Sequence, residues 1–176
     1  ITISNKKEIK TVLKKLEEVL KLHIMQQKKA GVEVVQIFDS WAGLLKEDDL
    51  EEYCFTPNKN LVNFCREIAI PSICFPKGLK SNYKKFVEKV KPDAINIDQK
   101  VDPMWAKTNL SNVCIQGGMD PELLLGNEKK VLEETERYLE IFKNNLYIFN
   151  LGHGILPETN PNIVKKIVDK VNLITK

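Results

Sequence analysis

Short apolar runs alternate with amphipathic helical stretches along all 176 residues of this chain. The runs are rich in β-branched and aromatic residues, as buried strands are, and the stretches between them carry apolar residues at helical spacing. Strands that alternate with helices pair in parallel through right-handed crossovers, so the sequence predicts an α/β fold with a parallel sheet. The predicted strands are residues 33–38, 71–75, 93–98, 112–117 and 146–151, and the predicted helices are residues 6–29, 46–69 with a break before Pro57, 81–90, 103–109, 121–143 and 161–174.

Three of the predicted helices begin with the same combination of residue types. Asp102, Asp120 and Asn160 each precede a proline. A short polar side chain at this place accepts a hydrogen bond from the first helical turn, and proline is tolerated at the first helical position. We therefore expect these three residues to be N-caps.

Two architectures fit the alternation: an open doubly wound sheet, or part of a (β/α)₈ barrel. No glycine-rich phosphate loop follows the first predicted strand, which argues against a dinucleotide-binding sheet. A whole barrel needs roughly 250 residues and eight strands, so five strands predict only part of one. The chain has no linker or low-complexity segment, and residues 1–176 are therefore predicted to be a single domain.

Composition excludes several classes of function. The net charge of +3 comes from interspersed lysines and carboxylates, which is not the basic stripe of a nucleic-acid-binding protein. No apolar run approaches the roughly 18 residues of a membrane span, and the N-terminal stretch lacks the apolar core of a signal peptide. Cys54, Cys65, Cys74 and Cys114 have no metal-site spacing, which favours reduced structural thiols and a cytoplasmic location.

Polar and glycine residues follow each predicted strand, where a parallel sheet builds its functional edge. They include Asp39 and Ser40, Lys77, Asp98 and Gln99, the segment 116–120, and His153 between two glycines. Asp39 and Ser40 could instead cap a turn, Asp120 is expected to be only a cap, and Lys77 could be a solvated loop residue. The glycines beside His153 favour a functional histidine, whereas His23 is expected to be a surface or packing residue. A serine hydrolase is disfavoured, because no G-x-S-x-G motif surrounds Ser40.

Five motifs carry a family resemblance over essentially the whole chain. They are QIFDSWAGLL (36–45), FPKG (75–78), INID (95–98), IQGGMDPELLL (115–125) and NLGHGILPETNPNIV (150–164). In order and spacing they resemble the C-terminal half of uroporphyrinogen decarboxylase. The resemblance implies the last five or so strand-helix units of that family's (β/α)₈ barrel, with the N-terminal part absent from this chain.

The resemblance also implies an activity: decarboxylation of the four acetate side chains of uroporphyrinogen III to give coproporphyrinogen III, in porphyrin and haem biosynthesis. The family uses no cofactor and no metal, and it works as a cytoplasmic homodimer on this small-molecule substrate. By motif, Ser40 resembles a serine that hydrogen-bonds a substrate carboxylate. His153 resembles a catalytic histidine that contacts a carboxylate and assists proton transfer. Phe38 resembles an aromatic residue that packs against the macrocycle.

Several family features have no counterpart here. The arginine-bearing loop, the central aspartate and the active-site tyrosine precede the matching region, and the only arginines are Arg66 and Arg137 in helical patterns. One alternative is therefore a catalytically inactive part of the enzyme that serves only in folding or assembly. Another is a cobalamin-linked methyltransferase of the same superfamily, whose zinc ligands would fall at Phe75, Lys77 and His153. Only the last of these is a metal-binding residue type, which favours the decarboxylase.

Overall fold

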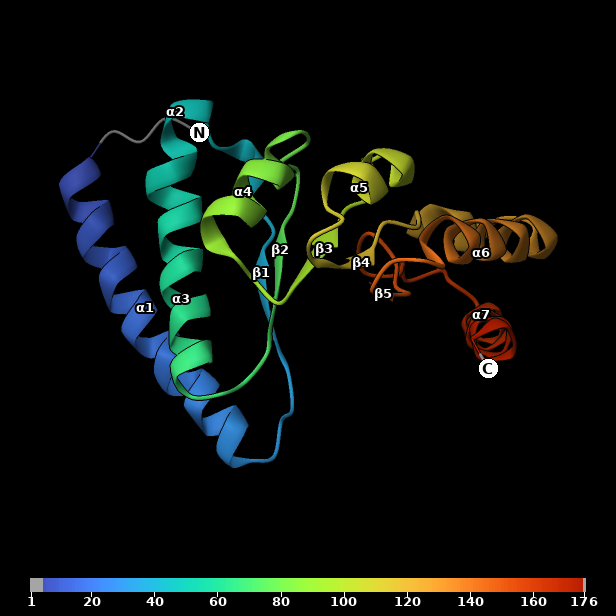
Figure 1. Ribbon diagram of the computed structural model, residues 1–176, viewed down its shortest axis with the longest axis horizontal. Coiled ribbons are helices and arrows are strands. Elements are labelled where there is room, and N and C mark those ends of the chain that lie inside the picture. The colour runs from blue at the N-terminus through green and yellow to red at the C-terminus, as the bar shows by residue number, and fades with distance from the viewer. Residues whose placement is uncertain (1–4, 176) are drawn as a thin grey trace. The chain divides into compact units, whose positions relative to one another are not determined.

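The computed structural model describes residues 5–175. The chain separates into two compact units, the first ending at Ile95 and the second beginning at Asn96. Strands and helices alternate through both units (Figure 1). The strands are β1 (Val35–Asp39), β2 (Ser72–Pro76), β3 (Ala94–Ile97), β4 (Cys114–Gly117) and β5 (Tyr147–Ile148). The helices are α1 (Lys6–Lys29), η1 (Ala42–Leu44), α2 (Glu47–Leu50), η2 (Glu51–Phe55), α3 (Thr56–Glu67), α4 (Asn82–Val90), α5 (Pro103–Asn109), η3 (Pro121–Leu125), α6 (Glu128–Phe142) and α7 (Pro161–Ile174).

The strands form one sheet in the order β1-β2-β3-β4-β5. The β1–β2, β2–β3 and β4–β5 pairs are parallel, which confirms the predicted α/β fold. Sequential order in a parallel sheet follows from crossovers of one hand. The prediction that residues 1–176 act as one domain stays a prediction.

In the first unit, α1 packs against α3, and the two helices lie side by side (Figure 1). Ile24 of α1 joins Val35, Leu61, Cys65 and Ile70 in a buried apolar cluster. The β1–β2 ladder runs in register from Val35 opposite Ser72 to Asp39 opposite Pro76. Both strands therefore end at the same level, and their following loops are brought together.

The predicted break before Pro57 is wrong. Helical backbone continues from α2 through η2 into α3, because η2 is a π-helical turn. The Thr56 N–H donates to the Glu51 carbonyl five residues back. Pro57 then falls in the first turn of α3, where its missing N–H costs nothing. A wide π turn thus accommodates the proline without ending the helix.

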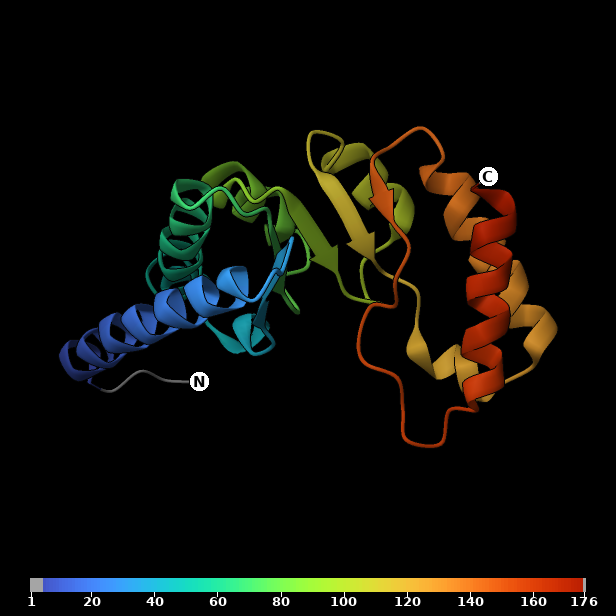
Figure 2. The same cartoon turned by 90° about the horizontal axis from the view of Figure 1, so that it is seen from below.

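In the second unit, α6 packs against both α5 and α7 (Figure 2). The helix predicted over residues 121–143 is in fact divided. The 3₁₀ turn η3 ends at Gly126, whose backbone is extended, and Asn127 then caps α6 by accepting from the Lys129 and Lys130 N–H groups. The prediction missed this second cap, which starts a separate helix.

Other predictions of local structure hold. Asp102, Asp120 and Asn160 accept hydrogen bonds from first-turn N–H groups at 2.8, 3.0 and 3.0 Å, which confirms the three caps. Cys54, Cys65 and Cys74 are free and buried, whereas Cys114 is only half-buried. Within residues 5–175, no helix is long and apolar enough to cross a membrane.

Candidate functional site

Loops at the carboxyl ends of the strands carry the predicted site residues. In the first unit, β1 presents Phe38 at 66% exposure, and its ring lies nearly perpendicular to the Phe75 ring with centroids 6.0 Å apart. Ser40 is exposed in the turn that follows, beside Trp41 at 73% exposure. Trp41 is therefore a surface residue and not part of the core. Phe38, Ser40 and Trp41 together offer an aromatic and hydroxyl-bearing surface.

The loops after β1 and β2 are joined by backbone contacts. The Lys77 N–H donates to the Asp39 carbonyl at 3.1 Å, and the Gly43 N–H donates to the Lys77 carbonyl at 2.9 Å. A Cβ atom at Gly43 would lie only 2.6 Å from the Gly78 carbonyl oxygen. Two motifs that lie far apart in the sequence thus form one loop pair, and Lys77 is half-buried within it.

Asp39 turns its carboxylate inward, toward the helices. Its Oδ2 accepts from Asn58 Nδ2 at 3.1 Å, and the Cys54 thiol hydrogen-bonds the same carboxylate. Burial raises the pKa of Asp39, and these two hydrogen bonds partly oppose that rise. The 3₁₀ turn after β1 has no side-chain cap, so capping does not account for Asp39.

In the second unit, a buried polar network lies beneath the segment 116–120. Gln116 Nε2 donates to Asn96 Oδ1 at 2.6 Å, and both side chains are 3% exposed. Gly117 and Gly118 then adopt positive φ angles of 82° and 100°, which glycine reaches without strain. Their carbonyls accept from two tyrosine hydroxyls, that of Tyr147 at 2.9 Å and that of Tyr138 at 2.8 Å.

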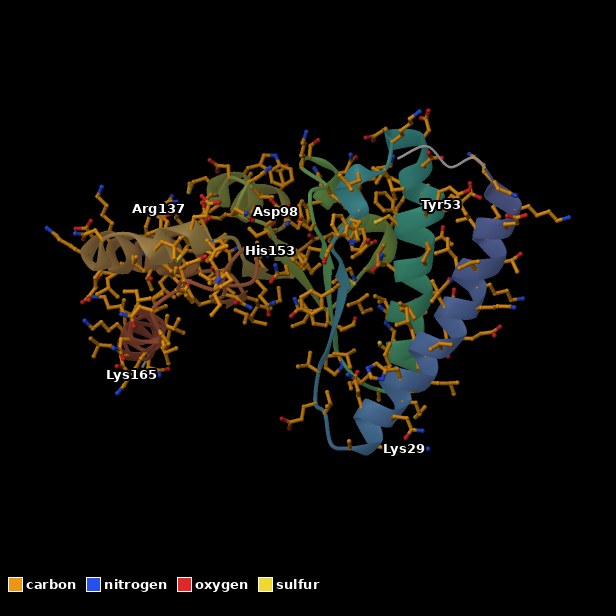
Figure 3. All side chains as sticks on the ribbon, turned by 180° about the vertical axis from the view of Figure 1, so that it is seen from behind. Lys29, Tyr53, Asp98, Arg137, His153 and Lys165 are labelled. Atoms are coloured by element: carbon orange, nitrogen blue, oxygen red, sulfur yellow. The ribbon has the colours of Figure 1, made fainter. Side chains whose placement is uncertain are left out.

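The same network holds the loop that bears His153. Leu151 forms a parallel bridge with Met119, and the Gly152 N–H donates to the Met119 carbonyl at 2.7 Å. The Gly152 backbone also lies against residues 98 and 99, because a Cβ there would be 2.3 Å from the Gln99 nitrogen. His153 itself is exposed, whereas Asp98 is buried (Figure 3). The loops after β3, β4 and β5 therefore contact one another, with the imidazole on their outer side.

The structure also shows polar residues that sequence reasoning missed. Asn58 of α3, Tyr138 of α6 and Tyr147 of β5 donate hydrogen bonds to residues at or beside the ends of other strands. Asn96 of β3 accepts from Gln116 of β4. Asn96 interrupts an apolar run, which was a usable signal. No group of three potential metal-ligating carboxylate, thiol or imidazole side chains occurs among residues 5–175.

Comparison with known proteins gives a consistent result. The family model described as "Uroporphyrinogen decarboxylase (URO-D)" matches residues 1–173. The uroporphyrinogen decarboxylase of Cereibacter sphaeroides (strain ATCC 17029 / ATH 2.4.9) is 39% identical over 153 residues, which cover 85% of this chain and 45% of the relative. That of Rickettsia bellii (strain RML369-C) is 39% identical over 166 residues, which cover 93% and 49%.

A solved structure shares the fold. A methyltransferase from Methanosarcina mazei superposes with a TM-score of 0.77 at 17% identity, covering 91% of this chain and 48% of its own. The chain thus spans about half the length of the curated relatives it matches. The strand-helix units predicted as part of a TIM barrel agree with this fold, and the family model accounts for nearly every residue. The chain therefore belongs to the uroporphyrinogen decarboxylase family.

Proposed function

We propose that this chain supplies strand-end loops to a uroporphyrinogen decarboxylase, which removes CO₂ from the four acetate side chains of uroporphyrinogen III to give coproporphyrinogen III. The observation that carries the proposal is the match of the family model over residues 1–173, joined to relatives of that name at 39% identity. The exposed side chains at the strand ends are of the types that this chemistry requires.

The chemistry needs an electron sink, because loss of CO₂ from an acetate leaves an electron pair on carbon. Protonation of the electron-rich pyrrole at a ring carbon supplies that sink. When the C–CO₂ bond breaks, its electrons neutralise the cationic ring and leave an exocyclic methylene group. A second proton converts this group to the methyl group, and loss of the first proton from the ring carbon then restores the neutral pyrrole. The protein's part is therefore to donate protons, hold carboxylates and shield the ring from water.

Three residues take these parts. The exposed Ser40 hydroxyl donates a hydrogen bond to a substrate carboxylate. The exposed His153 imidazole binds a carboxylate and assists proton transfer, and the glycines beside it leave room for close approach. Phe38, at 66% exposure, packs against the face of the macrocycle.

The test is anaerobic incubation with uroporphyrinogen III, followed by oxidation and chromatographic measurement of coproporphyrin. The chain is assayed alone and together with the part of the Rickettsia bellii relative that it does not cover. His153→Ala is compared with His23→Ala, the other histidine, which is exposed on α1. We expect the mixture to turn over the substrate. His153→Ala should reduce that turnover, whereas His23→Ala should leave it unchanged. Equal turnover in both variants would remove the role assigned to His153, and absence of product in every mixture would overturn the proposed activity.

A second function is assembly without catalysis, and exposed apolar surface in each unit favours it. On α1, Val12, Leu16 and Val19 are 50–61% exposed at helical spacing. In the second unit, an apolar cavity of about 300 Å³ opens beside α7. Its lining residues are Leu124, Phe149, Asn150, Leu151, Ile155, Val164, Ile167, Val168, Val171 and Asn172.

Surfaces of this kind are covered in stable proteins by another segment or chain. We expect the isolated chain to self-associate or to bind the complementary part of a relative, as measured by sedimentation velocity. A monomeric chain that decarboxylates the substrate unaided contradicts this second function.

The methyltransferase alternative rests on fold likeness alone. Elemental analysis of the purified chain discriminates it, because a zinc content near one ion per chain would favour the methyltransferase.

A further inference from the structure

The Asn58 side chain reaches from α3 to the end of β1. It is 4% exposed, and its Nδ2 donates both to the Cys54 carbonyl at 2.9 Å and to Asp39 Oδ2 at 3.1 Å. The first bond is local, whereas the second crosses 19 positions of sequence from a helix to a strand end. Buried amides keep such bonds because an unmade one is costly.

The π turn η2 places Asn58 for this contact. The helix widens over Glu51–Phe55 and returns to α-helical form at Thr56-Pro57, one residue before Asn58. The bond from Asn58 Nδ2 to the Cys54 carbonyl then restrains the amide on its own helix. The second amide hydrogen is left to point at Asp39, so the bond to the Cys54 carbonyl helps to fix the orientation in which the amide meets the strand end.

Asp39 is consequently held from two sides. Its backbone carbonyl accepts from the Lys77 N–H of the loop after β2, and its carboxylate accepts from Asn58 and from the Cys54 thiol. With both ends of the residue restrained, the next peptide leaves β1 in one direction. Ser40 and Trp41 are the residues that this peptide presents.

We propose that Asn58 is a positioning residue for the loop of Ser40 and Trp41, acting through the Asp39 carboxylate. That this loop binds a substrate rests on the proposed function, whereas the effect of Asn58 on the order of the loop does not. The contact brings a neutral donor to the strand end, so it fixes the loop without adding a cation beside the Ser40 hydroxyl.

Hydrogen exchange under native conditions tests this directly. The amides to follow are those of Gly43 and Leu44, which donate to the Lys77 and Trp41 carbonyls. Asn58→Ala is compared with Asn60→Ala, because Asn60 lies on the same helix and donates to a carboxylate, that of Glu17, at 2.7 Å. The Asn60 contact joins α3 to α1, away from β1, and so reports the effect of general destabilisation.

We expect exchange of the two loop amides to become about tenfold faster in Asn58→Ala, the effect of one lost buried hydrogen bond. In Asn60→Ala we expect less than about a twofold change at a similar fall in melting temperature. Asp39→Asn should keep protection, because its amide oxygen still accepts from Asn58. Exchange of the two loop amides should be as fast in Asp39→Ala as in Asn58→Ala. The double variant should exchange little faster than either single variant.

Equal exchange rates in Asn58→Ala and Asn60→Ala would overturn the inference, as would full additivity in the double variant. Asp39→Ala removes the same contact from the strand, so it serves if Asn58→Ala does not fold. No decarboxylation is measured here. Failure of the proposed function would leave the exchange result standing, and failure of this inference would leave the activity assay standing.

Discussion

Gly152→Ala introduces one methyl group into the tightest backbone contact of the second unit. An ideal Cβ would lie 2.3 Å from the Gln99 nitrogen and 2.9 Å from the Asp98 carbonyl carbon, whereas ordinary contact begins at 3.4 Å. Both neighbours are backbone atoms, so no side chain can rotate away. The loop must move by about 1 Å, which costs about 1–3 kcal/mol as overpacking. The same movement weakens the hydrogen bond from the Gly152 N–H to the Met119 carbonyl, which adds about 1 kcal/mol to the cost of the substitution.

We therefore expect Gly152→Ala to lower the free energy of unfolding by about 2–4 kcal/mol, measured by urea titration of the circular dichroism signal. Gly154→Ala is the matched control on the other side of His153. A Cβ there meets nothing within 4 Å, and φ is not positive. That variant should be neutral or more stable by about 0.4–1 kcal/mol. If the two variants differ by less than about 1 kcal/mol, the proposed packing of this loop on residues 98 and 99 is wrong.

Three further variants test other contacts at the strand ends. Gly43→Ala should destabilise the chain by about 1–3 kcal/mol in the same titration, because its Cβ would lie 2.6–2.7 Å from backbone atoms of Gly78. Tyr138→Phe removes the hydrogen bond to the Gly118 carbonyl and should cost about 1 kcal/mol. Burial raises the pKa of Tyr138 to about 12. The stability advantage of the wild type over Tyr138→Phe should therefore be fully present below pH 10 and be lost as the pH rises through 12. Burial also raises the pKa of Asp39. The free energy of unfolding of the wild type should therefore fall, relative to that of Asp39→Asn, as the pH rises above the ordinary aspartate range. If the two free energies differ by the same amount at every pH, this expectation is wrong.

The strand ends could be predicted because a change of composition marks them. Apolar runs give way to Asp39, to Lys77-Gly78 and to Gly117-Gly118, and each predicted strand except the last ends within one residue of the observed one. The last was predicted over residues 146–151, yet only Tyr147–Ile148 forms the ladder. A short edge segment depends on what pairs with it, and periodicity carries no information about pairing partners.

The buried side chains that hydrogen-bond to residues at those strand ends could not be predicted. Asn58 looked like an ordinary helix residue after a proline, because nothing local indicates that a π turn will aim its amide at Asp39. Tyr138 likewise fits the apolar face of α6, and only the folded chain brings its hydroxyl to the Gly118 carbonyl. Periodicity identifies which residues are buried, whereas the partner of a buried polar group is a property of tertiary structure.

The side chains that hold the strand-end loops share a chemical property. Ion pairs such as Lys21–Glu17 and Lys166–Glu128 lie on the helices, where water screens them. Beneath the strand-end loops, the bonds shown are made by neutral donors: the Asn58 amide, the Gln116 amide and the hydroxyls of two tyrosines. A buried cation there would carry a large desolvation cost, which a neutral donor avoids. A neutral donor holds each loop in place without adding a charge beneath the side chains that the loop presents.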